Sequence, residues 1–349
     1  MTSQKPARAA IVGCGDISSI HVDALQRLEI PVVGVCDTVP ERAEKVARTL
    51  EVPAFTDHTE LLARTGPDVV HVCTPHAEHL PVARDVLDGE AHLLVEKPLA
   101  ATLAQAEELV AAAEAARRRG VRTGVVLQNR YNPPNRRLHE LVHTGALGEV
   151  LAAKADVNWH RTADYYRARP WRGTWSGAGG GVMMNQAIHT LDLLLWLLGP
   201  AEEVRGHADT YALAEVIEVE DTAEFVISHA SGARSTLFAT NAYPLNAPVT
   251  VTVHATEATA VVSGDLTVTW TDGRTETVAP AVPGSVGRSY WGDSHRLLIE
   301  DFYARLEESE PFWIDPAAGL APVAAIAAVY DASPGLAGRV PAAASLTRF

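Results

Sequence analysis

The chain has 349 residues, of which 47% are hydrophobic and 21% charged, a balance typical of globular proteins and sufficient for two domains with buried cores. Its 43 acidic and 29 basic side chains give a formal net charge of −14, which disfavours binding to nucleic acids and to anionic membranes. The sequence has neither an apolar run of the ~18 residues that a membrane span requires nor the apolar core of a signal peptide.

The three cysteines, Cys14, Cys36 and Cys73, have no C-x-x-C spacing. The sequence therefore predicts neither a disulfide framework nor a zinc cluster, and we expect a cytoplasmic protein. Lysine is scarce, with only four residues, so each lysine is a candidate for a specific role.

In the first part of the chain, short β-branched runs alternate with stretches of helical period, a pattern typical of a parallel sheet with crossover helices. Strands are expected over 9–12, 32–36, 54–55, 69–73, 93–95 and 123–127. Helices are expected over 18–28, 40–50, 58–64, 78–88 and 102–119.

In the second part, strand-like runs follow one another with few helices between them, which favours a largely antiparallel sheet. Strands are expected over 150–157, 222–228, 234–240, 250–255, 260–262 and 266–270, and helices over 182–198, 294–308 and 316–331. The prolines of Asn132-Pro133-Pro134 indicate a boundary. We predict an α/β domain over 1–130 and an α+β domain with an open, largely antiparallel sheet over 131–349.

The segment Gly13-Cys14-Gly15-Asp16-Ile17-Ser18 lies between a predicted strand and a predicted helix and resembles the dinucleotide fingerprint G-x-G-x-x-G, with serine at its third position. An ordinary strand–helix turn is the alternative for this segment alone. Asp37 ends the next strand, where a carboxylate accepts hydrogen bonds from ribose hydroxyls and repels a 2′-phosphate. The two features predict a Rossmann domain that binds NAD rather than NADP. The alternative is that Arg42 pairs with the 2′-phosphate of NADP.

Two further polar segments follow predicted strands, Thr74-Pro75-His76 and Glu96-Lys97-Pro98. The carboxyl ends of parallel strands meet at one edge of a sheet, so both segments should face the cofactor crevice. A lysine beside an oxidised nicotinamide can exchange a proton with an alcohol. A proline-containing turn and a salt-bridged lysine remain the alternatives.

Together with His79, these motifs resemble the Gfo/Idh/MocA family of nicotinamide-dependent sugar and cyclitol oxidoreductases. The second half carries the other motif of that family, Gly179-Gly180-Gly181-Val182-Met183-Met184-Asn185-Gln186-Ala187-Ile188-His189-Thr190-Leu191-Asp192. On a regular helix Asn185, His189 and Asp192 share one face, which favours a site over a single satisfied core histidine. The motif offers no obvious third ligand for a metal ion, so no metal site is predicted.

The resemblance implies that Lys97 and His189 flank the substrate carbon that exchanges hydride with the nicotinamide, and that the Lys97–Pro98 peptide bond is cis. Inositol-dehydrogenase-like members have aspartate where this chain has Asn185, which leaves proton transfer to Lys97 and His189. With asparagine at this position, the chain resembles the sugar 3-ketoreductases and glycoside-modifying members of the family.

The resemblance also implies binding positions in both halves of the chain. Those for the cofactor are Gly13, Gly15, Asp16, Ile17, Asp37, Arg42, Thr74, Pro75, His76, His79, Glu96, Lys97, Asn129, Trp171 and Arg172. Those for the substrate are Lys97, Arg130, Trp159, Arg172, Asn185, His189 and Tyr290, and the stretch Tyr290-Trp291 with His295 is similar to a second family segment.

Residues 158–175 contain three tryptophans, two tyrosines and four arginines. Aromatic rings suit the apolar face of a sugar, and guanidinium groups suit anionic substituents. A packed, charged excursion of the chain explains this composition equally well.

The leading hypothesis is an NAD-dependent oxidoreductase acting on a secondary hydroxyl or the matching ketone of a sugar, glycoside or sugar derivative. The resemblance implies C3 as the carbon that reacts. One alternative is a redox-type glycoside hydrolase that works by transient oxidation, elimination, water addition and re-reduction. A non-catalytic NAD-binding sensor is the other. An open sheet leaves one face to be covered, so a homodimer or homotetramer is expected.

Overall fold

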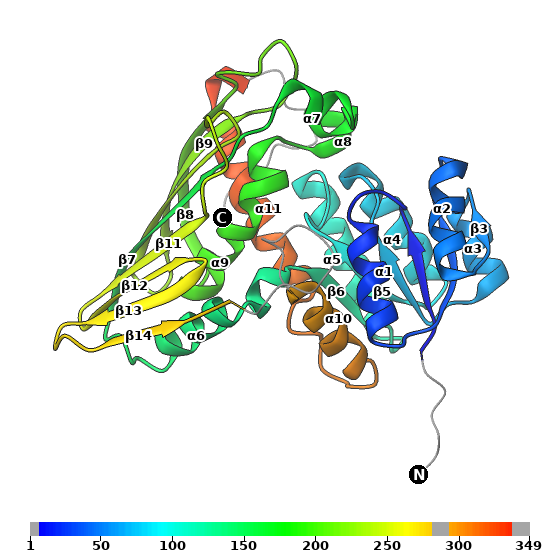
Figure 1. Ribbon diagram of the computed structural model, residues 1–349, viewed down its shortest axis with the longest axis horizontal. Helices are drawn as coiled ribbons and strands as arrows, with labels where there is room; N and C mark the ends of the chain where they lie inside the picture. Colours follow the sequence, from blue (N-terminus) through cyan, green and yellow to red (C-terminus); the bar gives the residue numbers. More distant parts are fainter. Residues whose placement is uncertain (1–6, 281–292, 337–349) are drawn as a thin grey trace. The chain divides into compact units, whose positions relative to one another are not determined.

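The computed structural model describes residues 7–280 and 293–336, which form two compact units (Figure 1). The first unit contains residues 7–100, 105–128 and 293–320, and the second contains 101–104, 129–280 and 321–336. The first unit thus includes residues beyond the 1–130 range proposed from the sequence, because helix α10 (Ser294–Ala304) packs against α1 (Ser18–Arg27) and strand β6 (Thr123–Val126).

The first unit contains a six-stranded, fully parallel sheet in the order β3-β2-β1-β4-β5-β6. Its other strands are β1 (Ala9–Val12), β2 (Val32–Cys36), β3 (Ala54–Phe55), β4 (Val69–Val72) and β5 (His92–Glu96). The connecting helices are α2 (Pro40–Leu50), α3 (His58–Thr65), α4 (His79–Asp88) and α5 (Leu103–Arg117). The predicted α/β Rossmann fold is confirmed.

The strand order places β1 beside β4, at the point where the connections change direction across the sheet. Ligands of open α/β sheets bind beyond the carboxyl ends of the strands at such a point. Strands β1, β4 and β6 are buried at every residue, as expected for strands covered on both faces by helices. The motifs predicted at the strand ends therefore stand on rigid supports.

The second unit contains an eight-stranded sheet in the order β14-β13-β12-β11-β7-β10-β9-β8, antiparallel except for the parallel pair β7 and β10. The strands are β7 (Val150–Asn158), β8 (Ala201–Asp209), β9 (Thr222–His229), β10 (Arg234–Thr240), β11 (Thr250–Ala255), β12 (Ala258–Ser263), β13 (Asp265–Trp270) and β14 (Thr275–Val278). The expected open, largely antiparallel sheet is confirmed.

Helices α6 (Pro133–His143), α9 (Ile188–Leu198) and α11 (Pro316–Asp331) accompany this sheet, and the α11 side chain Val329 packs on Gly206 of β8. Besides short helical pieces, the sequence interpretation missed the strands β8 and β14 and the helix α6. Strands β8 and β14 are the edge strands and are rich in polar residues, so they lack a strong apolar alternation. Helix α6 begins at the two prolines, which occupy its first turn, where no backbone donor is needed.

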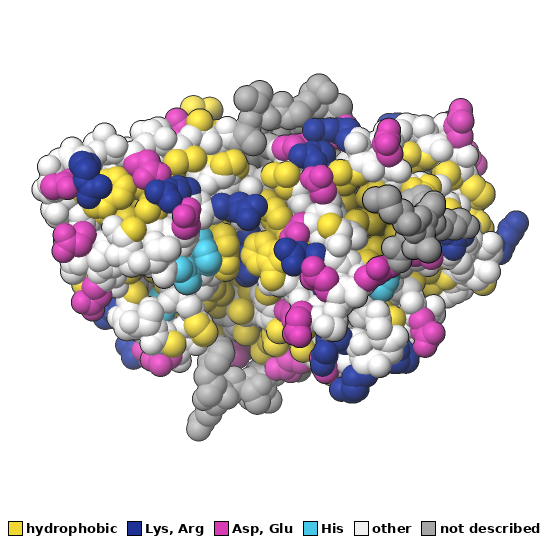
Figure 2. All heavy atoms as spheres, turned by 90° about the horizontal axis from the view of Figure 1, so that it is seen from below, with side chains coloured by type: hydrophobic (Ala, Val, Ile, Leu, Met, Phe, Trp, Pro, Cys, Tyr) yellow, Lys and Arg dark blue, Asp and Glu magenta, His cyan; other side chains and the backbone are white. Residues whose placement is uncertain are grey.

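Residues 158–175 fold into short helical pieces, α7 (Ala163–Arg167), η3 (Pro170–Gly173) and the start of α8 (Trp175–Ala178). A π-helical turn, η4 (Met183–Ala187), precedes α9, where the sequence predicted one regular helix. Figure 2 shows acidic and basic side chains interspersed over the face in view. No helix in 7–280 or 293–336 is both long and apolar enough to cross a membrane.

Candidate active site

The glycine turn between β1 and α1 packs tightly against the end of β4. Gly13 has a φ of +96°, and a Cβ at this position would lie 2.5 Å from the carbonyl carbon of Cys73. At Gly15 a Cβ would meet nothing within 4 Å, so glycine leaves open space before the N-terminus of α1. The third-position serine, Ser18, is buried and donates a hydrogen bond of 2.7 Å to the Gly15 carbonyl oxygen, which fixes the turn.

Asp37 is held beside this turn by two backbone donors. The amide N–H groups of Cys14 and Val39 lie 2.8 and 2.9 Å from its two carboxylate oxygens. A carboxylate has about four acceptor positions, so capacity remains for ribose hydroxyls. Of the neighbouring predicted positions, Asp16 and Arg42 are exposed and Ile17 is half-buried.

The segment after β4 presents one unused polar atom toward this region. The Thr74 hydroxyl oxygen is buried and has no hydrogen-bond partner among the residues that the structure describes. Together with the open space at Gly15 and the fixed carboxylate of Asp37, it fits a bound dinucleotide. The structure therefore agrees with NAD as the cofactor, and the residues that would hold it are Gly13, Gly15, Asp37 and Thr74.

Two histidines that the sequence assigned to cofactor binding lie inside the domain. His79 is fully buried, and its ring nitrogens lie 2.8 Å from the Pro98 carbonyl oxygen and 3.1 Å from the Thr74 carbonyl oxygen. His76 is buried with its ring 5.8 Å from that of His79. The His79 ring thus joins the loop carrying Thr74 and Pro75 to the loop after β5, and its contact with the cofactor stays a prediction.

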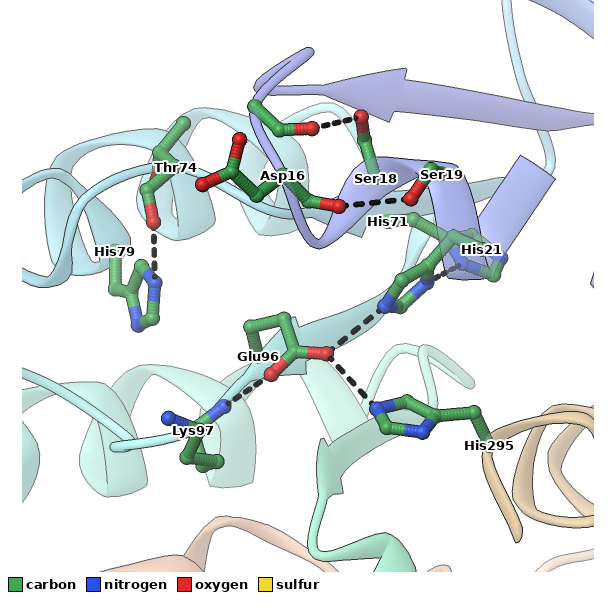
Figure 3. A network of polar contacts seen from close by, with 11 residues as sticks. Asp16, Ser18, Ser19, His21, His71, Thr74, His79, Glu96, Lys97 and His295 are labelled. Carbon is green, nitrogen blue, oxygen red and sulfur yellow. Dashed lines mark hydrogen bonds and ion pairs between the residues drawn. The ribbon is translucent and has the colours of Figure 1, made fainter. Parts of the chain in front are cut away.

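A chain of buried polar groups lies beneath the end of β5 (Figure 3). His21 Nε2 lies 2.9 Å from Glu96 Oε1, and His21 Nδ1 lies 2.8 Å from His71 Nδ1. His71 Nε2 lies 2.9 Å from the Tyr303 hydroxyl, and His295 Nε2 lies 3.7 Å from Glu96 Oε1. Each of these three hydrogen bonds has one donor and one acceptor when Tyr303 donates to His71, His71 donates to His21, and His21 donates to the Glu96 carboxylate.

The polar groups that surround Glu96 keep its carboxylate charged. Burial alone would raise its pKa, but the hydrogen bond from His21 and the charges of His21, His295 and Lys97 lower the pKa to about 2. Burial lowers the pKa of His295 to about 4 and that of His71 well below its usual range, so both rings are neutral at pH 7. Glu96 thus positions its neighbours, and its contact with the cofactor stays a prediction.

Lys97 follows Glu96 directly and is half-buried between buried neighbours. Its backbone N–H donates to Glu96 Oε2 at 3.1 Å, so the carboxylate fixes the main chain from which the lysine side chain extends. The Lys97–Pro98 peptide bond is cis, as expected. Among the lysines, this one thus stands on a rigid, partly desolvated strand end.

In the second unit, the helix after the glycine run has two polar side chains that are only half-buried. Within residues 181–195, Asn185 and His189 are half-buried and all other residues are buried. Asp192, three residues after His189 on the regular helix α9, is buried and does not join them, so the predicted polar stripe is limited to Asn185 and His189. Asn185 and His189 are thus the two residues of this stretch that keep partial solvent exposure.

Asp192 is instead neutralised inside the unit by Arg130. The guanidinium donates from Nε and Nη2 to the two carboxylate oxygens at 3.0 and 2.6 Å, and both side chains are buried. The Arg130 guanidinium also lies 5.6 Å from the ring centre of Trp196. Arg130 thus forms a structural ion pair, and its contact with substrate stays a prediction. The adjacent Asn129 is half-buried.

Glu220 is a buried residue of this unit that the sequence interpretation missed. Its carboxylate accepts hydrogen bonds from the Gly181 and Met183 amides at 2.8 and 2.9 Å and from the Tyr330 hydroxyl at 3.0 Å. Burial raises its pKa to about 7, although these donors act in the opposite direction. Glu220 thus fixes the start of the segment that carries Asn185, and no local pattern around it pointed to this role.

Five of the aromatic and basic residues of 158–175 form one stacked cluster. Arg161 lies 4.8 and 5.2 Å from the ring centres of Trp159 and Tyr165, and Arg172 lies 4.6 and 5.7 Å from those of Tyr165 and Trp171. All five side chains are half-buried, so the cluster is neither core nor fully solvated. Tyr290 and Trp291 lie outside the described residues.

Comparison with known proteins identifies the family. Residues 7–125 match the model of an oxidoreductase family with an NAD-binding Rossmann fold, and residues 135–261 match the GFO/IDH/MocA C-terminal domain. The chain belongs to the Gfo/Idh/MocA family. The predicted family and its cofactor NAD are thereby confirmed.

Among similar solved structures, the WlbA dehydrogenase from Bordetella pertussis, in complex with NADH and UDP-GlcNAcA, is 30% identical, with a TM-score of 0.81 over 94% of this chain and 96% of that chain. The D-glucoside 3-dehydrogenase of Escherichia coli is 30% identical over 60% of this chain and 59% of its own length. A glycosyl hydrolase family 109 protein of Streptomyces filamentosus is 30% identical over 48% of this chain and 36% of its own length. The match therefore spans three fifths or less of these two curated relatives.

Proposed function

We propose that the protein is an NAD-dependent oxidoreductase that transfers a hydride between nicotinamide and a secondary hydroxyl, or the matching ketone, of a sugar, glycoside or sugar derivative, at C3. The observation that carries the proposal is Lys97, half-buried on a strand end fixed by Glu96 in the same unit as the glycine turn and Asp37. The similarity to a D-glucoside 3-dehydrogenase supports both the substrate class and the carbon.

The proposed roles follow from the chemistry of each side chain. When bound, NAD supplies a nicotinamide ring that accepts and returns a hydride. Lys97 takes the hydroxyl proton during oxidation and returns it during reduction. His189 and Asn185, the uncovered pair of the second unit, bind and orient the sugar hydroxyls, and the amide of Asn185 takes no part in proton transfer.

The half-buried cluster of Trp159, Tyr165 and Trp171 with Arg161 and Arg172 has the chemistry to bind a sugar ring with an anionic substituent. Aromatic faces pack on the C–H groups of the ring, and the guanidinium groups pair with the charge. We propose this cluster as a specificity determinant of the enzyme. An anionic substrate preference that weakens with salt is its expected signature.

A second candidate is a glycoside hydrolase in which oxidation is transient. Oxidation at C3 acidifies the neighbouring C–H bond, the glycosidic substituent is eliminated, water adds, and the ketone is reduced again by the NADH formed in the first step. The similarity to a glycosyl hydrolase family 109 protein favours this candidate. The two candidates share Lys97 and differ in whether NADH accumulates.

The test is a panel of neutral and acidic sugars, cyclitols and aryl glycosides, each incubated with the purified protein with and without NAD. Absorbance reports NADH, and chromatography reports released aglycone. The proposed oxidoreductase produces NADH in proportion to oxidised sugar, whereas aglycone release at catalytic NAD without net NADH identifies the hydrolase. NADH binding with neither product across the panel contradicts both candidates and supports a sensor.

We further propose a cytoplasmic homodimer or homotetramer assembled through the open face of the second-unit sheet. Val226 of β9 and Phe238 of β10 lie on the exposed face of that sheet and are 37% and 38% exposed. A second copy is the simplest cover. Sedimentation analysis of Phe238→Lys should show a smaller species than the parent protein, and an unchanged species contradicts this interface.

A further inference from the structure

Arg122 carries a buried charge that the proposed function does not use. The residue directly precedes β6 and is 5% exposed. Its Nη2 donates to the Glu308 carbonyl oxygen, but Nε and Nη1 are buried and have no hydrogen-bond partner within 7–280 and 293–336. Three of the five guanidinium N–H groups are therefore unsatisfied, a costly arrangement for a buried cation.

A cavity of about 470 Å³ adjoins this side chain, within the range of small-molecule sites. Its walls are the end of α5, residues 120–123, and residues 308–312 and 315–317 of the same unit. Val110, Ala113, Val121 and Phe312 give it an apolar lining. The hydroxyl of Thr123, another lining residue, is also buried without a partner among the described residues.

The cavity lies at the amino-terminal ends of the parallel strands, whereas the cofactor residues lie at their carboxyl ends. Arg122 and Thr123 stand where β6 begins, whereas Lys97 stands beyond the end of β5, and these neighbouring strands are parallel. A ligand of the cavity would therefore not touch the glycine turn or Lys97. This separation makes the cavity a site of its own.

The carboxylates that line the cavity are mostly occupied elsewhere. Glu114 pairs with Arg117 at 2.8 Å and Glu308 with Arg305 at 3.2 Å, while Asp315 accepts from the Ala318 amide at 3.0 Å. The remaining one, Glu310, is exposed, and its charge acts on Arg117. The lining holds four acidic side chains and, with Arg117 and Arg118 beside Arg122, three arginines. Its formal charge of −1 disfavours multiply charged anions and admits a single negative charge at Arg122.

We propose that this cavity binds a small organic monocarboxylate with an apolar body, its carboxylate accepting hydrogen bonds from Arg122 and Thr123. The carboxylate supplies the acceptors that the buried guanidinium lacks, and the apolar body packs on Val110, Ala113 and Phe312. The site is a second ligand site of the cofactor-binding unit, and it stands whether or not the proposed sugar chemistry is correct.

The test measures binding of benzoate and hexanoate to the full-length protein by calorimetry, with benzamide and inorganic phosphate as comparison ligands. We expect saturable binding of the carboxylates and none of benzamide or phosphate. Arg122→Met should weaken carboxylate binding by about 30-fold or more, the lower range for removing one partner of a buried charge pair. Arg119→Met is the matched control, because Arg119 bonds to the Leu87 carbonyl oxygen and does not line the cavity.

A second variant keeps the result interpretable if Arg122→Met fails to fold. Val110→Trp fills the cavity without touching the guanidinium and should abolish binding of both carboxylates, while NADH binding is retained in both variants. The proposal is overturned if benzamide binds as well as benzoate, if phosphate alone binds, if neither carboxylate binds at millimolar concentration, or if the folded variants bind like the parent protein.

Discussion

Each unit of the molecule contains a deeply buried glutamate, and the two behave in opposite ways. Glu96 has a pKa lowered to about 2, whereas Glu220 has a pKa raised to about 7. Burial pushes both values up, so burial does not account for the difference. Glu96 faces the ionisable groups His21, His295 and Lys97, while Glu220 faces two backbone amides and the Tyr330 hydroxyl.

The comparison shows that the kind of partner decides whether a buried carboxylate keeps its charge. A permanent negative charge at Glu96 suits a position beside a lysine that exchanges protons. A titratable carboxyl at Glu220 suits a purely mechanical role, since either protonation state can hold the glycine turn before Asn185.

The largest effect on stability is expected for Glu96→Gln. The substitution removes the anion that accepts from His21 Nε2 and from the Lys97 amide and that compensates the charge of half-buried Lys97, so the free energy of unfolding should fall by about 3 kcal/mol. Chemical denaturation at neutral pH measures it, with the exposed Glu108→Gln as the control. A loss below about 1 kcal/mol would show that the charge of Glu96 does not stabilise the buried polar groups around it.

Glu220→Gln should change the pH dependence of stability. The folded pKa lies near 7 and the ordinary value near 4.5, so the folded protein binds the proton more tightly, and this group costs stability as the pH rises from about 4.5 through 7. Relative to the parent protein, the glutamine variant should gain up to about 3 kcal/mol between about pH 5 and pH 8. Equal pH profiles for the two proteins would refute the raised pKa.

His295→Gln should act with the opposite sign. The folded ring has a pKa near 4 and the ordinary value is 6.5, so the unfolded chain binds more protons between these values, and the parent protein loses stability as the pH falls through that window. Between about pH 6.5 and pH 5 the loss is about 2 kcal/mol, and the variant should not show it. A variant that loses as much as the parent protein would argue against a neutral His295.

The smallest effect is expected for Tyr303→Phe, at the outer end of the buried chain. Only one neutral hydrogen bond, to His71 at 2.9 Å, is removed, so the free energy of unfolding should fall by about 1 kcal/mol. Turnover should change little, because Glu96 keeps its bond to His21. A turnover loss as large as that of a Lys97 substitution would assign this chain a role in proton transfer.

The sequence was most informative where a function depends on local pattern. The alternation of β-branched runs and helices predicted every strand of the parallel sheet, and the polar segments at strand ends predicted Asp37 and Lys97. The edge strands β8 and β14 escaped prediction because one neighbour and a polar composition give no clear alternation.

Contacts between distant residues could not be predicted in the same way. Arg130 and Asp192 each look like ligand-binding residues in isolation, but 62 positions apart they neutralise one another. His21 and His71 lie in ordinary helix and strand patterns, and only the fold brings them to Glu96. Pairing of buried charges depends on tertiary packing, which local periodicity does not encode.

Turnover of Lys97→Met, on the sugar that gives NADH in the panel, tests the proposed chemistry most directly. Loss of the acid/base should lower kcat by about 10²–10⁴-fold, while the Kd for NADH stays unchanged because the glycine turn and Asp37 are intact. Lys154→Met, at an exposed lysine of β7, is the control and should be fully active. A kcat for Lys97→Met within about twofold of the parent protein would contradict the assignment of Lys97 as the proton-transfer residue.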